Sequence, residues 1–279
     1  MNAKIAMLKE IARTLVPAGA ARDGFGAGEG DQRPASAGIA TPANGFRALR
    51  LSLNGNCRLA FHTDPGGLAA EQYRLLRRKL TSRYPQGATL LITSPAPGDG
   101  KTLNAANLAW CLAEGNRPTF LLEADLRRPS MARVFGCVPR HGVEEVLTGE
   151  AEPEATVRAV SGVPLCVAMV AKGHDEPIRL FQHPRTKAFL GWARKEFRWV
   201  VMDAPPIFPV ADVAELCPLV DGALLVVRAR RTPRDLVSKS LESLGDRLIG
   251  IILNDAADCY DSHYHYLSAY HRYYSQGKK

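Results

Sequence analysis

A chain of 279 residues, 46% of them apolar, is long enough for one or two domains with a buried core. Its formal net charge of +8 would suit nucleic acid, an anionic membrane, phosphates or acidic partners, but residues 1–87 hold thirteen Lys or Arg against six Asp or Glu, so most of the excess is regional. No helix-turn-helix, zinc or aromatic signature of a nucleic-acid module is present, so we expect no nucleic-acid partner.

The N-terminal segment predicts a short helix over residues 4–16, but Lys9, Glu10 and Arg13 interrupt it, unlike the apolar core of a signal peptide. No stretch approaches the roughly 20 apolar residues of a membrane span. The six cysteines are widely spaced and form no C-x-x-C pair, which argues against a zinc site or a disulfide framework. We therefore expect a cytoplasmic protein with reduced thiols.

Residues 1–67 are interpreted as an N-terminal extension and linker. The sequence over 17–44 is rich in Gly, Ala and Pro and nearly free of large apolar side chains, as linkers are. After it, the alternating sequence LRLSL-NG-NCRLAF predicts a hairpin around Asn54-Gly55, because both central positions of a type I′ turn need a positive φ.

Residues 68–256 predict a single α/β domain. A helix at 68–83 is followed by apolar strands that alternate with helices, a rhythm typical of a mostly parallel sheet with helices on both faces. The expected strands are 88–94, 118–124, 164–170, 199–204, 222–229 and 248–254, and the expected helices between them are 102–114, 142–148, 185–197, 210–217 and 233–244.

The first of these strands leads directly into SPAPGDGKTLNAANLA, which predicts a nucleotide-binding loop. Gly98 and Gly100 allow a tight turn whose N–H groups approach an anion, Lys101 can reach the β and γ phosphates, and Thr102 can ligate Mg²⁺. The strict P-loop pattern has Gly where this chain has Pro95, so a structural glycine turn is the alternative. The strand before and the helix after favour a P-loop NTPase that binds ATP and Mg²⁺.

Two later strands end in carboxylates. Glu123 and Asp125 follow the strand in FLLEADLRRP, and Asp203 ends the strand in WVVMDAPP. Carboxylates at strand ends are often only helix caps or solvated loop residues. Because the carboxyl ends of parallel strands share one edge of the sheet, beside the Lys101 loop, a role in holding Mg²⁺ and positioning a nucleophile is favoured.

The chain ends in a run of tyrosines without a clear strand or helix period, which predicts either a partner-docking tail or a substrate of modification. This tail, residues 257–279, holds six of the eight tyrosines of the chain: Tyr260, Tyr264, Tyr266, Tyr270, Tyr273 and Tyr274.

Together, APGDGKT, LLEADLRRP, VVMDAPP and the terminal tyrosines resemble the bacterial tyrosine kinases that govern capsule and exopolysaccharide assembly. The helix at 68–83 adds the family's E-x-x-R-x-x-R spacing with Glu71, Arg74 and Arg77. In the family this motif joins subunits into a ring, so that one subunit's tail enters its neighbour's site. The alternative for Glu71 and Arg74 is a simple i, i+3 pair on a helix.

The resemblance implies an ATP-dependent protein tyrosine autokinase that regulates polysaccharide polymerisation and export. Lys101, Glu123, Asp125 and Asp203 would be catalytic, with Thr102, Asp125 and Asp203 at the metal and Glu123 orienting or deprotonating the phenol. The six tail tyrosines would be the autophosphorylation sites. The expected ATP-binding residues are Gly98, Asp99, Gly100, Lys101, Thr102, Leu103 and Asn254, the last resembling an adenine contact in related folds or serving only as a turn residue.

One departure from the family concerns Glu123, where Asp is usual. The extra methylene shifts the carboxylate, and a displacement of about 1 Å can lower a rate about a hundredfold. The alternatives are therefore a catalytically weak nucleotide-binding adaptor, or a non-kinase P-loop ATPase of the partitioning type. The latter carry an extra Lys at the position of Ala96, which this chain lacks, and have no tyrosine tail.

The resemblance also implies partners. They are a membrane-spanning polysaccharide chain-length or co-polymerase activator on a separate chain, further copies of this chain in a homo-oligomeric ring, and a cognate tyrosine phosphatase. The activator would place the protein at the inner face of the plasma membrane.

Overall fold

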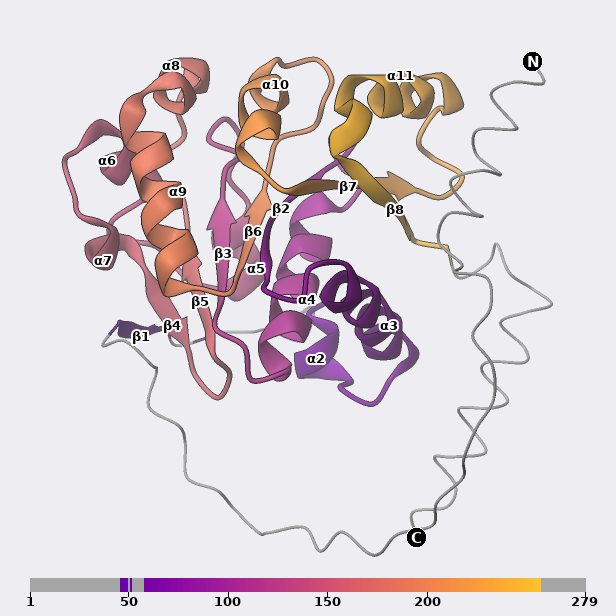
Figure 1. Cartoon of the computed structure of the whole chain (residues 1–279), viewed down its shortest axis with the longest axis horizontal. Helices are drawn as coiled ribbons and strands as arrows, with labels where there is room; N and C mark the ends of the chain where they lie inside the picture. The colour runs from indigo at the N-terminus through magenta and orange to yellow at the C-terminus, as the bar shows by residue number, and fades with distance from the viewer. Residues whose placement is uncertain (1–45, 50, 52–57, 257–279) are drawn as a thin grey trace, which may run out of the picture. The chain divides into compact units, whose positions relative to one another are not determined.

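An eight-stranded sheet organises the computed structural model, which describes residues 46–49, 51 and 58–256 (Figure 1). Its strand order is β1-β4-β5-β3-β6-β2-β7-β8, and every neighbouring pair is parallel except the antiparallel pair β4 and β5. The strands are β1 (Arg47–Leu49), β2 (Ala88–Thr93), β3 (Thr119–Glu123), β4 (Arg158–Val160), β5 (Leu165–Ala168), β6 (Trp199–Asp203), β7 (Gly222–Arg228) and β8 (Leu248–Asn254).

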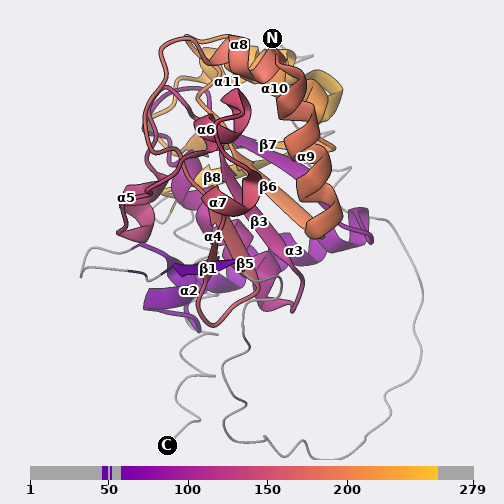
Figure 2. The same cartoon turned by 90° about the vertical axis from the view of Figure 1, so that its left-hand side faces the viewer.

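Helices cover both faces of this sheet, as the near-continuous apolar strands predict. The helices are α2 (Ala60–Thr63), α3 (Leu68–Arg83), α4 (Lys101–Glu114), α5 (Met131–Phe135), α6 (Val143–Thr148), α7 (Pro153–Thr156), α8 (Pro177–Gln182), α9 (Pro184–Glu196), α10 (Asp212–Leu216) and α11 (Arg234–Leu244), with 3-10 turns at Cys217–Leu219 and Gly245–Arg247. Figure 2 shows α9 and α5 on opposite sides of the strands.

Successive residues of each central strand enter two different cores, because side chains of a strand alternate between its faces. In β3, Phe120 and Leu122 pack in the core under α6, α8, α9 and α10, whereas Leu121 packs in the core under α3, α4 and α5. On the first face Phe120 stacks on Phe197, with ring centroids 4.9 Å apart. The expected mostly parallel α/β sheet is thus confirmed.

The six strands and six helices expected over residues 68–256 all form, and each of their ends lies within two residues of the expected position. The short elements α5, α7, β4 and α8 have no counterpart in the sequence prediction. Each has six residues or fewer, which leaves at most a weak helical or strand period. None of the helices that the structure describes is long and apolar enough to cross a membrane.

The N-terminal boundary differs from the expectation. β1 pairs with β4, and Phe46, Leu49, Leu59 and Phe61 are buried in the two cores. Every described residue falls in one compact unit of the chain. The packed body therefore begins before residue 68.

The expected second arm of the hairpin is also different, because Ala60–Thr63 forms helix α2. The backbone N–H of Ala60 donates to the Asn107 side chain of α4 at 2.7 Å, which anchors this helix rather than a strand. The Asn54-Gly55 turn, the helix at 4–16 and the linker at 17–44 lie outside the described residues.

We predict that a chain starting at residue 68 is much less stable than one starting at residue 46. The shorter chain loses four buried apolar side chains, each contributing about 1.5–3 kcal/mol. Urea unfolding followed by circular dichroism measures the difference, and the chain starting at residue 46 is the matched control for removal of the preceding segment. Equal midpoints for the two truncated chains would contradict the boundary drawn here.

Candidate active site

The loop between β2 and α4 has the geometry of an anion-binding turn. Gly98 and Gly100 have φ angles of +86° and +97°, a region that other residues rarely adopt. A Cβ on Gly100 would also lie 2.2 Å from the Asn254 side-chain nitrogen. Glycine is therefore required at position 100, and α4 starts at the next residue with its N-terminus at the loop.

The loop is held in place by the segment that follows β7 and by the end of β8. The Asp99 carboxylate accepts hydrogen bonds from the Ala96 backbone at 3.1 Å and the Thr232 hydroxyl at 2.8 Å. The Asn254 side chain donates to the Asp99 carbonyl at 2.8 Å. Asp99 and Asn254 are both among the expected ATP-binding residues. In the structure their side chains make hydrogen bonds that hold the shape of the loop.

Lys101 is the centre of the site. Its side-chain nitrogen lies 2.8 Å from Asp125 and 3.6 Å from Asp203, and the residue is only 9% exposed. Burial lowers the pKa of the ammonium group, but the charges of Asp203 and Asp125 outweigh that effect and raise it overall. Lys101 is therefore a fixed, protonated cation at the base of the loop.

Asp203 is the acidic residue of the site whose oxygens make the fewest bonds within the part of the chain that the structure describes. It is fully buried, and neither carboxylate oxygen has a hydrogen-bond partner among the described residues. Burial raises the pKa of this carboxyl, while the Lys101 charge acts against the rise. The Lys101 ammonium group, 3.6 Å away, offsets the cost of this buried carboxylate without completing its hydrogen bonds, and a divalent cation bound directly to it would offset the cost further.

A magnesium ion fits the groups around Asp203. The Thr102 hydroxyl lies at the start of α4, 2.9 Å from the Ser130 hydroxyl. The described residues contain no cluster of three His, Cys, Asp or Glu that would form an all-protein metal site. Mg²⁺ commonly takes only one or two protein oxygens and completes its shell with phosphates and water, which matches Thr102 and Asp203.

Glu123 has a different environment from the one expected of a catalytic base. It is fully buried, and its carboxylate accepts hydrogen bonds from the backbone N–H groups of Ser130 at 2.6 Å, Met131 at 2.8 Å and Val170 at 2.9 Å. Burial raises its pKa to about 7 against the lowering effect of these bonds. The structure therefore argues against the expectation that Glu123 receives the phenol proton.

The longer side chain explains this position. Glu123 reaches both the start of α5 and the backbone after β5, and so joins two segments at the edge of the sheet. The acidic residue two positions further on, Asp125, instead lines the cavity beside the glycine loop.

A cavity of about 660 Å³ opens beside the loop. That volume is within the range of about 300–1,000 Å³ typical of small-molecule sites. Among the residues that line it are the expected Gly98, Gly100, Lys101, Thr102, Leu103 and Asp125. Asp99, Glu123, Asp203 and Asn254 are not among its lining residues.

Four residues of the site carried no prediction. Ser130, Arg128 and Arg133 line the cavity, and both arginines are exposed. Arg127 makes a bidentate pair with the fully buried Asp212 at 2.7 and 3.0 Å, which fixes the segment after β3 to α10. The RR pair in LLEADLRRP was the signal available for Arg127 and Arg128. The contact of Ser130 with Thr102 and that of Asp212 with Arg127 form only in the folded chain.

The residues expected to join subunits lie on α3 against α4. Arg74 pairs with Glu71 at 2.6 Å and with Glu114 at 3.3 Å, and Arg77 donates to the Cys111 carbonyl at 2.7 Å. The i, i+3 pair therefore forms within one chain. Leu75, on the same helix, is 54% exposed. The six tail tyrosines lie outside the described residues.

The parallel sheet, the glycine loop before α4 and the carboxylates beside Lys101 define a P-loop nucleotide-binding protein. No family model matches the chain. Tyrosine-protein kinase YwqD of Bacillus subtilis is 32% identical over 197 residues, which are 69% of this chain and 83% of YwqD. The chain thus belongs to the family of bacterial tyrosine kinases of capsule and exopolysaccharide biosynthesis.

Two other similar proteins are a longer polypeptide and a solved kinase domain. The succinoglycan biosynthesis transport protein ExoP of Rhizobium meliloti is 32% identical over 61% of this chain, but the match covers only 22% of ExoP. The solved kinase domain of the Escherichia coli tyrosine kinase ETK is 27% identical, with a TM-score of 0.66 over 72% of this chain and 81% of that domain.

The same fold extends to a more distant protein. The septum site-determining protein MinD of Pyrococcus horikoshii, solved with Mg-ADP, has a TM-score of 0.50 over 60% of this chain and 70% of that one, at 21% identity. That level of identity shows a shared fold only.

We predict that Glu123→Gln changes how stability depends on pH. Because the folded state binds the Glu123 proton more tightly than the unfolded chain does, the stabilisation is complete below about pH 4.5 and is lost as the pH rises through about 7. The free energy of unfolding of the original chain, minus that of the variant, should fall by about 2–3 kcal/mol between pH 5 and pH 8.

Urea unfolding at both pH values gives this difference, and Glu154→Gln, an exposed residue of α7, controls for loss of one carboxylate. A difference that is the same at pH 5 and pH 8 would contradict the prediction.

Proposed function

We propose that this chain transfers the γ-phosphoryl group of ATP to protein tyrosine hydroxyls, those of its own C-terminal tail among them. The observation that carries the proposal is the buried Lys101 between Asp125 and Asp203 at the base of the 660 Å³ cavity. The 32% identity to YwqD over most of that kinase's length supports tyrosine as the acceptor.

The binding groups follow from the loop. Its backbone N–H groups and the Lys101 ammonium group hold the phosphates, and Leu103 borders the same cavity. Thr102 and Asp203 would hold Mg²⁺, which when bound neutralises phosphate charge. Arg128 and Arg133 extend the positive charge along the cavity, where charge spreads over the transferred group.

Asp125 is the carboxylate best placed to accept the phenol proton. It lines the cavity and is 4% exposed. One of its oxygens lies 2.8 Å from the Lys101 nitrogen, and the other accepts a hydrogen bond from the Arg128 backbone N–H at 3.1 Å. In the step, the phenol oxygen forms a bond to the γ-phosphorus, the bond to the β-phosphate oxygen breaks and ADP leaves, and the phenol proton passes to Asp125. A phenol with a pKa near 10 attacks more readily once its proton has an acceptor.

Glu123 acts as a positioning residue in this proposal. Its carboxylate holds the backbone of Ser130, and the Ser130 hydroxyl contacts Thr102. A substitution at Glu123 would therefore displace Thr102, a proposed Mg²⁺ ligand, through Ser130.

The cellular setting is proposed from the relatives. ExoP is by its name a biosynthesis transport protein for a polysaccharide, and the segment similar to this chain is one part of it. We therefore place the present chain beside a membrane-spanning partner of polysaccharide export at the inner face of the plasma membrane, with ring assembly through α3 and reversal by a tyrosine phosphatase.

The proposed roles predict distinct losses of activity. With Mg²⁺ and γ-labelled ATP, Lys101→Met should lower phosphotyrosine formation about a hundredfold or more, and Asp125→Asn by a factor of about 10²–10⁴. Glu123→Gln, which keeps two of the three backbone hydrogen bonds, should stay within about tenfold of the original chain. Lys187→Met, an exposed lysine of α9, is the matched control for charge removal.

Mass spectrometry of the tail, with and without the cytosolic segment of the membrane partner, measures these rates. ATP hydrolysis without phosphotyrosine would instead identify a positional ATPase. Loss of activity in Glu123→Gln but not in Asp125→Asn would reverse the assignment of the base.

Phosphorylation should also change the assembly. Each phosphate adds about −1.5 to −2 charges, so a phosphorylated tail should leave a neighbour's site and the ring should dissociate. Native mass spectrometry before and after phosphatase treatment tests this, and a chain with all six tail tyrosines changed to Phe should stay assembled in Mg-ATP. An assembly state that ignores phosphorylation would refute the model.

A further inference from the structure

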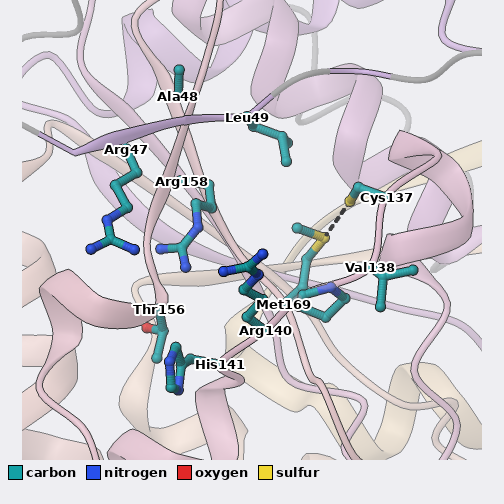
Figure 3. Close-up of a pocket in the computed structure, with 11 residues that line it drawn as sticks. Arg47, Ala48, Leu49, Cys137, Val138, Arg140, His141, Thr156, Arg158 and Met169 are labelled. Carbon is teal, nitrogen blue, oxygen red and sulfur yellow. Dashed lines mark hydrogen bonds between the residues drawn. The ribbon is translucent and has the colours of Figure 1, made fainter.

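A second cavity, of about 260 Å³, lies apart from the nucleotide loop, between β1, the start of β4 and the chain that follows α5 (Figure 3). Three arginines contribute to it from three segments: Arg47 in β1, Arg158 in β4 and Arg140 before α6. In Figure 3 the side chains of Arg140 and Arg158 reach the same part of the cavity, with Arg47 beside them.

These arginines have no carboxylate partners in the part of the chain that the structure describes. None of the ion pairs there includes Arg47, Arg140 or Arg158, and Arg158 donates only to the backbone carbonyls of Ala155 and Val157, at 2.7 and 2.8 Å. Burial, and then the charges of Arg47 and Arg140, lower the pKa of Arg158. The cavity therefore concentrates positive charge that an anion would offset.

The remaining wall is apolar. Leu49, Val138 and Met169 line the cavity beside the guanidinium groups, and Met169 contacts the Cys137 sulfur at 3.5 Å. A free phosphate would leave this wall uncovered, whereas a phosphate carried on an aromatic ring would cover it. The volume is below the roughly 300–1,000 Å³ of sites for larger ligands, and suits a single side chain better than a nucleotide.

We propose that this cavity is a binding site for phosphotyrosine, and that its occupant is a phosphorylated tyrosine of this chain's own C-terminal tail. The identity of the occupant rests on the proposed kinase function. Arginine clusters are a recurrent means of recognising phosphorylated side chains, since guanidinium groups form bidentate, charge-assisted bonds with phosphate. A membrane headgroup would reach a flat basic surface more easily than this recess.

Chain length selects among the tyrosines. The cavity lies at the β1 and β4 edge of the sheet and the tail leaves from β8 at the other edge, a span of about 34 Å for seven strand spacings. Tyr264 is eight residues beyond Ala256 and extends at most about 28 Å, and Tyr266, ten residues beyond, spans the distance only when the chain is fully extended. Tyr270, Tyr273 and Tyr274 have chain to spare for an intramolecular site. Occupancy would hold the modified tail away from the catalytic cavity.

The site also adjoins the catalytic segment. Met169 lines the cavity, and the next residue, Val170, donates its backbone N–H to Glu123. Cys137 follows α5, whose first residue donates to the same carboxylate. An occupant therefore contacts both segments that Glu123 joins.

The test uses a synthetic fluorescent peptide of residues 268–279 with phosphate on Tyr270, Tyr273 and Tyr274, added to the full chain with saturating Mg-ADP. Fluorescence anisotropy should show binding at least tenfold tighter than that of the unphosphorylated peptide. Arg47→Ala and Arg140→Ala, both at exposed residues, should each weaken binding about tenfold. Arg179→Ala, on α8 with an 82% exposed side chain, should leave it unchanged.

Because the peptide is synthetic and Lys101→Met should bind it equally well, failure of this inference is separate from failure of the kinase assay. Binding that is at least tenfold weaker with saturating Mg-ADP than without it would place the peptide in the catalytic cavity and overturn the inference. Equal affinity of the Arg140→Ala and original chains would overturn it as well. Binding of anionic phospholipid vesicles that depends on Arg47 and Arg140, without phosphopeptide binding, would replace it with a membrane contact.

Discussion

The burial of the Lys101 ammonium group between two carboxylates is the constraint on which the site depends. A lysine that is 9% exposed stays charged only because Asp125 and Asp203 lie beside it. Those carboxylates come from the ends of β3 and β6, which are neighbours in the sheet, and β6 in turn pairs with β2, the strand that leads into the loop. The order of the strands therefore decides which charges meet, and three distant segments of sequence become one site.

A buried carboxylate can stabilise the fold or take part in chemistry. Glu123, which ends β3, and Asp125, which follows it, have one of these roles each. Glu123 satisfies three backbone N–H groups and is closed to solvent, whereas Asp125 borders the cavity and meets the lysine. The additional methylene of Glu at position 123 extends its carboxylate to the backbone N–H groups of Ser130, Met131 and Val170. The departure from the usual Asp is thus compatible with an intact cavity.

Sequence patterns predicted the sheet, its main helices and the glycine loop, because each rests on a local period or on a turn that only glycine adopts. They missed α5, α7, β4 and α8, whose local periods are weak over six residues or fewer, and the helix at Ala60–Thr63, where contact with Asn107 in α4 overrides an alternating pattern. Of the site, Lys101, Thr102 and Asp125 were placed by motif. The inward turn of Glu123 and the pairing of Arg127 with Asp212 depend on segments that meet only in the folded chain.

The hydrogen bond from Asn254 to the glycine loop connects the position of that loop to the end of β8. The same residue that donates to the Asp99 carbonyl is the last of the strand, and Arg228 joins Asp255, one residue on, to the carbonyl of Gly98 at 3.4 Å. A force on the chain beyond Asp255 would act directly on these hydrogen bonds. The end of β8 therefore both precedes the C-terminal segment and holds the shape of the glycine loop, so a displacement of Asn254 or Asp255 would change the geometry of that loop.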